Sequence, residues 1–355
     1  MDRDELIKQI KHNCNISDAK FWGYYSICGL LLRYRELYRN EHSLMPWDVI
    51  PPDGITFWIN EREALWKGLE NEEFCPLIID GIQYDPFDVN GLNSHLKGSG
   101  LVYGGGYSTY GKPSFFLARL DDRKELYDYI IYYTGNELCR ELSASPAMLQ
   151  GRCIYIRFDV LRAILWEKFQ ELNARKYGGL LEEIFSCYGI GRNNAEPEKI
   201  CKKINDIACD ASQLLIMHEV GEAFEDDHSE EWFKILHSGI DKFSELYLRA
   251  AKDLLADTSE MGPLKTIMNH KNKSLLNFFM VFMDGIRKEI FPEIRNAFQE
   301  FVESDSWPAI ENARLTGYRR AVEMRDMILR SWREHGNTAG LANALKQYIK
   351  DAFTK

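Results

Sequence analysis

Patterns typical of β-strands are confined to the first 158 residues, and this segregation constrains the fold more than any other feature. LIIDGIQY places Asp80 and Gly81 between two β-favouring runs, which indicates a hairpin. GLVYGGGYSTYGKPSFFLARL, LYDYIIYY and RCIYIRF are expected to form further antiparallel strands. From about residue 159 onward only amphipathic helical patterns follow. We therefore predict an α+β N-terminal domain followed by an all-α helical C-terminal domain.

Two long helices are expected before these strands. The first covers residues 17–41, with Ser17 as N-cap, and is apolar almost all the way round, so it belongs inside a domain. The second runs near residues 53–70, with Asp53 as a candidate cap. Its apolar face consists of Ile55, Trp58, Leu65 and Leu69. The N-terminal domain should thus combine buried helices with a small antiparallel sheet.

Length, charge and cysteine content narrow the class of protein. A chain of 355 residues favours two domains, and we place the boundary near residue 176, which divides 1–176 from 177–355 in a predominantly helical chain. A net charge of -10 argues against nucleic acid as a partner. The first residues lack the apolar core of a signal peptide, and LLNFFMVFM is too short to span a bilayer. We expect a soluble cytoplasmic protein with reduced cysteines and no membrane partner; a homo-oligomer stays open.

The stretch LLIMHEVGEAFEDDHSEEW begins like the metalloprotease motif H-E-x-x-H, but Glu222 stands where the second histidine belongs. On a helical wheel His218, Glu222 and Glu225 continue a core-facing apolar stripe. That stripe comprises Ile204, Ile207, Ala211, Leu214, Leu215 and Gly221. Buried carboxylates require a cation, a metal or a hydrogen-bond donor. The alternative is that the helix leaves the core near Gly221, so that FEDDHSEE is a solvated acidic turn.

A metal site follows if the next helix returns antiparallel to this one. A turn centred near His228 would place His237 level with His218. His218, Glu222 and His237 would then hold one divalent metal ion, zinc or iron, with an open coordination position. Glu219 is the candidate general base, and Glu225 is the second catalytic candidate. H-E-x-x-E also arises by chance in acidic helices, so the motif alone is weak evidence.

Three functions remain open from these residues. The first is a metal-dependent enzyme that activates water, or carries out oxidative chemistry with iron, on a small polar substrate. The second is a metal-free enzyme that uses His218 and Glu222 as an acid/base pair. The third is a non-catalytic helical binding or assembly protein whose acidic turn faces solvent.

Two further groups of charged residues attract attention. Glu36 and Arg62 lie on the inner lines of the two N-terminal helices, which predicts a buried pair. That pair either specifies the fold or allows Arg62 to hold an anionic substrate group. GNELCRELSASPAM is predicted to be a short helix that carries a surface pair. The glycines of GSGLVYGGGYSTYGK match no phosphate-binding motif, so a tight hairpin or bulge is the better interpretation.

The stretches HNCNISDAKFWGYYSICGLLLRYREL and MHEVGEA resemble a family of bacterial proteins of unknown function, found mainly in anaerobes. The resemblance covers most of the chain as an N-terminal and a C-terminal unit. It implies no activity and carries over no catalytic residues, so every site assignment above depends on the residue patterns.

Overall fold

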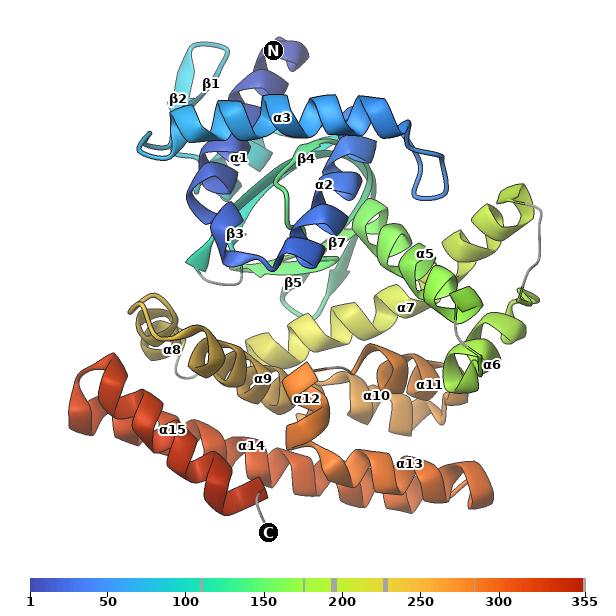
Figure 1. Cartoon of the computed structure of the whole chain (residues 1–355). Helices are drawn as coiled ribbons and strands as arrows, with labels where there is room; N and C mark the ends of the chain where they lie inside the picture. Colours follow the sequence, from blue (N-terminus) through green and yellow to red (C-terminus); the bar gives the residue numbers. More distant parts are fainter. Residues whose placement is uncertain (109–110, 175, 193–196, 226–228, 284, 354–355) are drawn as a thin grey trace. The chain divides into compact units, whose positions relative to one another are not determined.

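The computed structural model describes residues 1–108, 111–174, 176–192, 197–225, 229–283 and 285–353. The chain divides into two compact units, whose elements are labelled in Figure 1. Unit 1 spans Met1–Tyr177 and Ile190–Ala208, and unit 2 spans Gly178–Gly189 and Cys209–Lys355. Each unit therefore contains two separate stretches of the chain.

Unit 1 is built around a five-stranded sheet of order β3-β4-β5-β7-β6. Its strands are β3 (Leu101–Tyr107), β4 (Pro113–Leu126), β5 (Tyr129–Arg140), β6 (Ala147–Gln150) and β7 (Cys153–Arg157). β5 and β7 are parallel, and the other pairs are antiparallel. The prediction of a small antiparallel sheet is wrong, because the β6–β7 hairpin returns β7 alongside β5 in the same direction. The predicted helix in GNELCRELSASPAM is also wrong, since these residues extend β5 and begin β6.

The hairpin predicted from LIIDGIQY is confirmed. β1 (Leu77–Ile79) pairs antiparallel with β2 (Ile82–Tyr84) in a separate two-stranded sheet. The two turn residues have positive φ, 51° at Asp80 and 81° at Gly81. Positive φ at both positions is the geometry of the tight hairpin turns that Asp-Gly favours.

The α-helices of unit 1 are α1 (Arg3–Phe21), α2 (Ile27–Glu41), α3 (Pro52–Leu69), α4 (Val89–Leu96), α5 (Phe158–Ala174) and the N-terminal part of α7 (Pro197–Phe224). The single helix predicted over residues 17–41 is wrong. Ser17 lies inside α1, and Ser26 begins α2 by accepting a hydrogen bond from the Gly29 amide at 3.2 Å. α2 is not buried all round either, because Ile27 is 80 % and Leu31 51 % exposed. α1 packs on β4 and β5 and contacts α3 (Figure 1).

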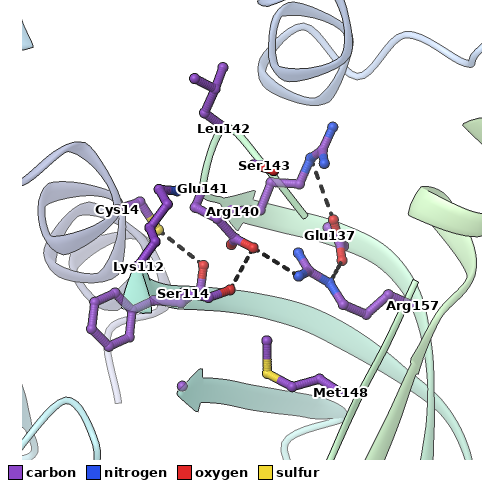
Figure 2. Close-up of polar contacts among 12 residues, drawn as sticks. Cys14, Lys112, Ser114, Glu137, Arg140, Glu141, Leu142, Ser143, Met148 and Arg157 are labelled. Atoms are coloured by element: carbon purple, nitrogen blue, oxygen red, sulfur yellow. Dashed lines mark hydrogen bonds and ion pairs between the residues drawn. The ribbon is translucent and has the colours of Figure 1, made fainter. Parts of the chain in front are cut away.

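Three acids and three bases lie buried where α1 packs on β4 and β5 and at the end of β7 (Figure 2). They are Asp18, Lys112, Glu137, Arg140, Glu141 and Arg157. Lys112 Nζ donates to Asp18 Oδ1 at 2.6 Å, and both side chains are 1 % exposed. The surface pair predicted for Glu137, Arg140 and Glu141 is therefore wrong, because these side chains belong to the core.

Arg157 is the centre of this buried group. Its Nε donates to Glu137, its Nη1 donates to Glu141 at 3.0 Å, and all three side chains are 0 % exposed. Its guanidinium carbon lies 4.0 Å from the centre of the Phe116 ring. Ser114 Oγ supplies a further hydrogen bond to Glu141 at 2.6 Å. Because each buried charge faces an opposite one, the group fixes how the strands and α1 meet.

We expect Arg157→Met to lower the free energy of unfolding of unit 1 by about 3–5 kcal/mol, because two buried carboxylates lose their cation. Arg119→Met is the control, since the Arg119 side chain is 64 % exposed in its pair with Asp121 and its loss should have little effect on stability. Urea unfolding followed by circular dichroism measures both. Similar small losses in the two variants would contradict the role given to Arg157.

Unit 2 contains helices and no strand among its described residues, which confirms the prediction of a helical second half. Its helices are α6 (Gly179–Cys187), the C-terminal part of α7 (Pro197–Phe224), α8 (Ser229–Leu236), α9 (Lys242–Thr258), α10 (Pro263–His270), α11 (Lys273–Phe282), α12 (Gly285–Ile290), α13 (Pro292–Ser304), α14 (Trp307–His335) and α15 (Thr338–Phe353). α14 packs on α9, α13 and α15. Within the described ranges no helix has the length and apolar character needed to cross a membrane.

Candidate functional site

The candidate site forms where α7 and α9 approach each other closely. A Cβ atom on Gly221 would lie 2.4 Å from the carbonyl oxygen of Ala256 and 3.1 Å from the Cα of Gly262. Only glycine permits this backbone contact, because real Cβ atoms do not come so close to backbone atoms. The contact places His218 and Glu222 of α7 beside the acidic residues of α9.

His218 lies among three carboxylates. Its Nδ1 is 2.8 Å from Asp257 Oδ1, and its Nε2 is 3.9 Å from both Glu222 Oε2 and Asp253 Oδ1. Arg287 donates to the other oxygen of Asp257. Burial favours the neutral ring, but the charge of Asp257 and its hydrogen bond outweigh burial and raise the pKa of His218 to about 10. At neutral pH the ring is therefore an imidazolium with an N–H on each nitrogen.

The negative charges of Glu219 and Glu222 are compensated to different extents by their surroundings. Lys252 donates to Glu222, and although burial opposes ionisation, the Lys252 charge holds the pKa of Glu222 below its ordinary value. Glu219 is 8 % exposed, and no hydrogen bond or ion pair joins it to a residue that the structure describes. Burial and the neighbouring charge of Glu222 raise the pKa of Glu219 to about 7. Glu219 therefore exchanges its proton near neutral pH.

The other two residues predicted near His218 have partners elsewhere in unit 2. Glu225 accepts hydrogen bonds from the Tyr318 hydroxyl at 3.0 and 3.3 Å. His237 Nδ1 lies 2.8 Å from the Phe233 carbonyl oxygen, and the two rings stack with centroids 3.9 Å apart. The predicted turn at His228 lies outside the described residues.

No three His, Cys, Asp or Glu side chains of the described ranges are arranged to hold a metal ion. His218 lies close to Asp257, Asp253 and Glu222. The Nδ1 atom of His237 instead contacts the carbonyl oxygen of Phe233, one turn earlier in the chain. The predicted metal site stays a prediction.

Two models of one family match this chain. The model described as family of unknown function (DUF6866) N-terminal domain matches residues 5–157, and the corresponding C-terminal domain model matches residues 162–352. The chain belongs to the DUF6866 family. The comparisons with curated proteins and with solved structures found no match. The expected two-part family of unknown function is confirmed, and its bacterial, anaerobic distribution stays an expectation.

The buried pair predicted between Glu36 and Arg62 of this DUF6866 chain is wrong. Arg62 Nη2 pairs with Glu41, while Glu36 pairs with Arg39 one turn along the same helix. The predicted inner line of the first helix ran through residues 22–26, where the helix is broken, so its phase was incorrect. The substrate-binding role proposed for Arg62 and Glu36 stays a prediction.

Sequence reasoning missed the residues that α9 and α12 contribute to the site. Asp253 and Asp257 are spaced i, i+4 and so share one face of α9, and Lys252 lies beside them. Arg287 comes from the short helix α12. The spacing of the two aspartates was visible in the sequence, but nothing in it shows which helix they face.

We expect Gly221→Ala to destabilise unit 2 by about 1–3 kcal/mol, because the new methyl group forces the backbones of α7 and α9 apart. Gly68→Ala in α3 is the matched control, since a Cβ there meets no atom within 4 Å and alanine favours a helix by up to about 1 kcal/mol. Thermal unfolding measures both changes. A Gly221→Ala protein as stable as Gly68→Ala would contradict the close contact.

Proposed function

We propose that this chain is an enzyme that transfers protons to and from a small polar substrate at the α7–α9 face. One observation carries the proposal: Asp257 holds His218 through Nδ1, while Nε2 is 3.9 Å from its carboxylate neighbours, which is too far for a hydrogen bond. The Nε2–H group can therefore donate to a substrate oxygen. The side chain is 19 % exposed, so a substrate atom can reach it.

The residues take different roles in this proposal. The His218 imidazolium acts as a hydrogen-bond donor and general acid that stabilises negative charge developing on the substrate. Asp257, itself held by Arg287, keeps the ring protonated and oriented. Glu219 is the proton acceptor, because a carboxyl with a pKa of about 7 is partly ionised at neutral pH. Glu222 is less suited to this role, since Lys252 keeps the pKa of Glu222 low and so makes it a weak base.

A metal-dependent form of this enzyme is the second candidate. His218 Nε2 faces Glu222 and Asp253 at equal distances, while Nδ1 is held by a carboxylate, as is common for metal-bound histidines. The predicted ligands to zinc or iron in this form are His218, Glu222 and His237, which would have to move together on binding because the described residues are not arranged as a metal site. The metal ion would activate a water molecule for hydrolysis.

We expect His218→Asn and Glu219→Gln each to lower kcat by about 10²–10⁴-fold, the usual contribution of a general acid or base. Small chromogenic esters, amides and phosphate esters serve as substrates. The rate should rise with pH as Glu219 loses its proton near 7 and fall as His218 loses its proton near 10. Glu219→Gln should remove the rise, whereas the control His237→Asn should leave the whole profile unchanged.

Dialysis against a chelator separates the two forms. Activity that is lost on dialysis and restored by zinc or iron would favour the metal-dependent enzyme. Activity that survives dialysis would favour the metal-free enzyme. If the panel shows no turnover, or turnover that neither variant changes, the proposal fails and a non-catalytic binding or assembly protein becomes the better explanation.

A further inference from the structure

Hydrogen bonds link Tyr84, His95 and Asp80 of unit 1 into a relay. The Tyr84 hydroxyl lies 3.1 Å from Nδ1 of His95, and Nε2 of the same ring lies 3.1 Å from Asp80 Oδ2. Asp80 occupies the β1–β2 turn, Tyr84 ends β2, and His95 lies in the last turn of α4. The relay therefore joins a hydroxyl, an imidazole and a carboxylate, the three groups that together activate a nucleophilic oxygen in many hydrolases.

Two amide side chains fix the elements that carry the relay. Gln9 of α1 donates to the Ile78 carbonyl oxygen at 3.3 Å and accepts from the Ile78 amide at 2.7 Å, which holds β1. Asn93 donates to the Tyr103 carbonyl oxygen and accepts from the Tyr103 amide, both at 2.8 Å, which holds α4 beside β3. Because both elements are fastened through backbone groups, the relay is in place before any ligand arrives.

Asp80 determines which nitrogen of His95 carries the proton. Hydrogen bonds from the Met1 amine and from His95 hold the pKa of Asp80 below its ordinary value, so its carboxylate is ionised at neutral pH. An ionised carboxylate only accepts hydrogen bonds, so Nε2 of the neutral ring carries the hydrogen that points to Asp80. Nδ1 then has a free lone pair, to which the Tyr84 hydroxyl donates. The ring is thus oriented as a base toward a phenol.

A small molecule can approach this phenol from solvent. Tyr84 is partly buried against the core of unit 1, and the His95 side chain is 19 % exposed. The two rings meet edge to face with centroids 5.9 Å apart, so the imidazole does not cover the phenol ring. The ionised Asp80 carboxylate disfavours an anionic phosphoryl donor, and an uncharged ester fits the site better.

We propose that Tyr84 is a nucleophile that accepts an acyl group from an uncharged ester. Its oxygen forms a bond to the carbonyl carbon, and the bond from that carbon to the alcohol oxygen breaks. Nδ1 of His95 takes the phenolic proton during the attack and returns it to the departing alcohol oxygen. Asp80 positions the ring and stabilises the imidazolium that forms in between. This acyl-accepting site belongs to unit 1 and does not depend on the function proposed for the α7–α9 face.

Treatment of the full chain with p-nitrophenyl acetate, followed by peptide mass spectrometry, tests the inference. We expect Tyr84 to be acetylated faster than Tyr127, although Tyr127 is 65 % exposed in the turn between β4 and β5. His95→Asn should slow the reaction of Tyr84 by about 10²-fold, the lower end of the usual contribution of a general base. Tyr127 is the internal control, because its rate should be the same in both proteins.

Asp80→Asn tests the positioning role of the carboxylate. The rate at Tyr84 should reach its plateau at a lower pH, because the protonated ring has lost its charged partner, and the plateau should be lower because the ring is a weaker base. The pH profile at Tyr127 should not change. A Tyr84 profile that keeps its position in Asp80→Asn would contradict the role given to Asp80.

Two results would overturn the inference. The first is a wild-type protein in which Tyr84 is acetylated no faster than Tyr127, a comparison that needs no substitution. The second is a rate at Tyr84 that folded His95→Asn does not change. In either case the three residues would only fasten the β1–β2 hairpin to α4. His218→Asn should leave the acetylation of Tyr84 unchanged, so this inference and the proposed function fail separately.

Discussion

The contact between Gly221 and the carbonyl group of Ala256 determines the chemistry of unit 2. The two backbones meet without an intervening side chain, so the residues that flank the contact are brought together. His218 precedes Gly221 by less than one helical turn, and Asp257 follows Ala256 directly. The pairing of His218 with Asp257 is thus a consequence of how closely α7 and α9 pack.

The two units use buried charges in different ways. In unit 1, Asp18, Glu137 and Glu141 are matched by Lys112, Arg140 and Arg157, and the group is closed to solvent. Such matched charges stabilise one arrangement of strands and cannot easily exchange protons. In unit 2 the buried carboxylate of Glu219 forms no ion pair with a described residue, and burial raises its pKa to about 7. Perturbed, partly accessible groups of this kind are typical of functional sites.

The sequence predicted the local helices and turns better than it predicted which elements contact one another. The Asp80-Gly81 turn and the helical second half follow from short-range chemistry and could be read directly. His218 and Glu222 were placed on one helical face by periodicity alone. The residues that face them come from α9, which is 30 to 39 residues later in the chain, and helical spacing does not encode such contacts. The same limitation explains the wrong partner for Arg62 and the buried position of Glu137.

The protonation of His218 tests the central claim most directly. Nuclear magnetic resonance of the ring nitrogens, assigned with His218→Asn, follows its titration in the full chain. The account predicts an imidazolium through neutral pH with a pKa of about 10, and a lower pKa in Asp257→Asn, where the main stabilising charge is lost. A pKa near the ordinary value of 6.5 in the wild type, unchanged by Asp257→Asn, would contradict the pairing on which the proposed chemistry depends.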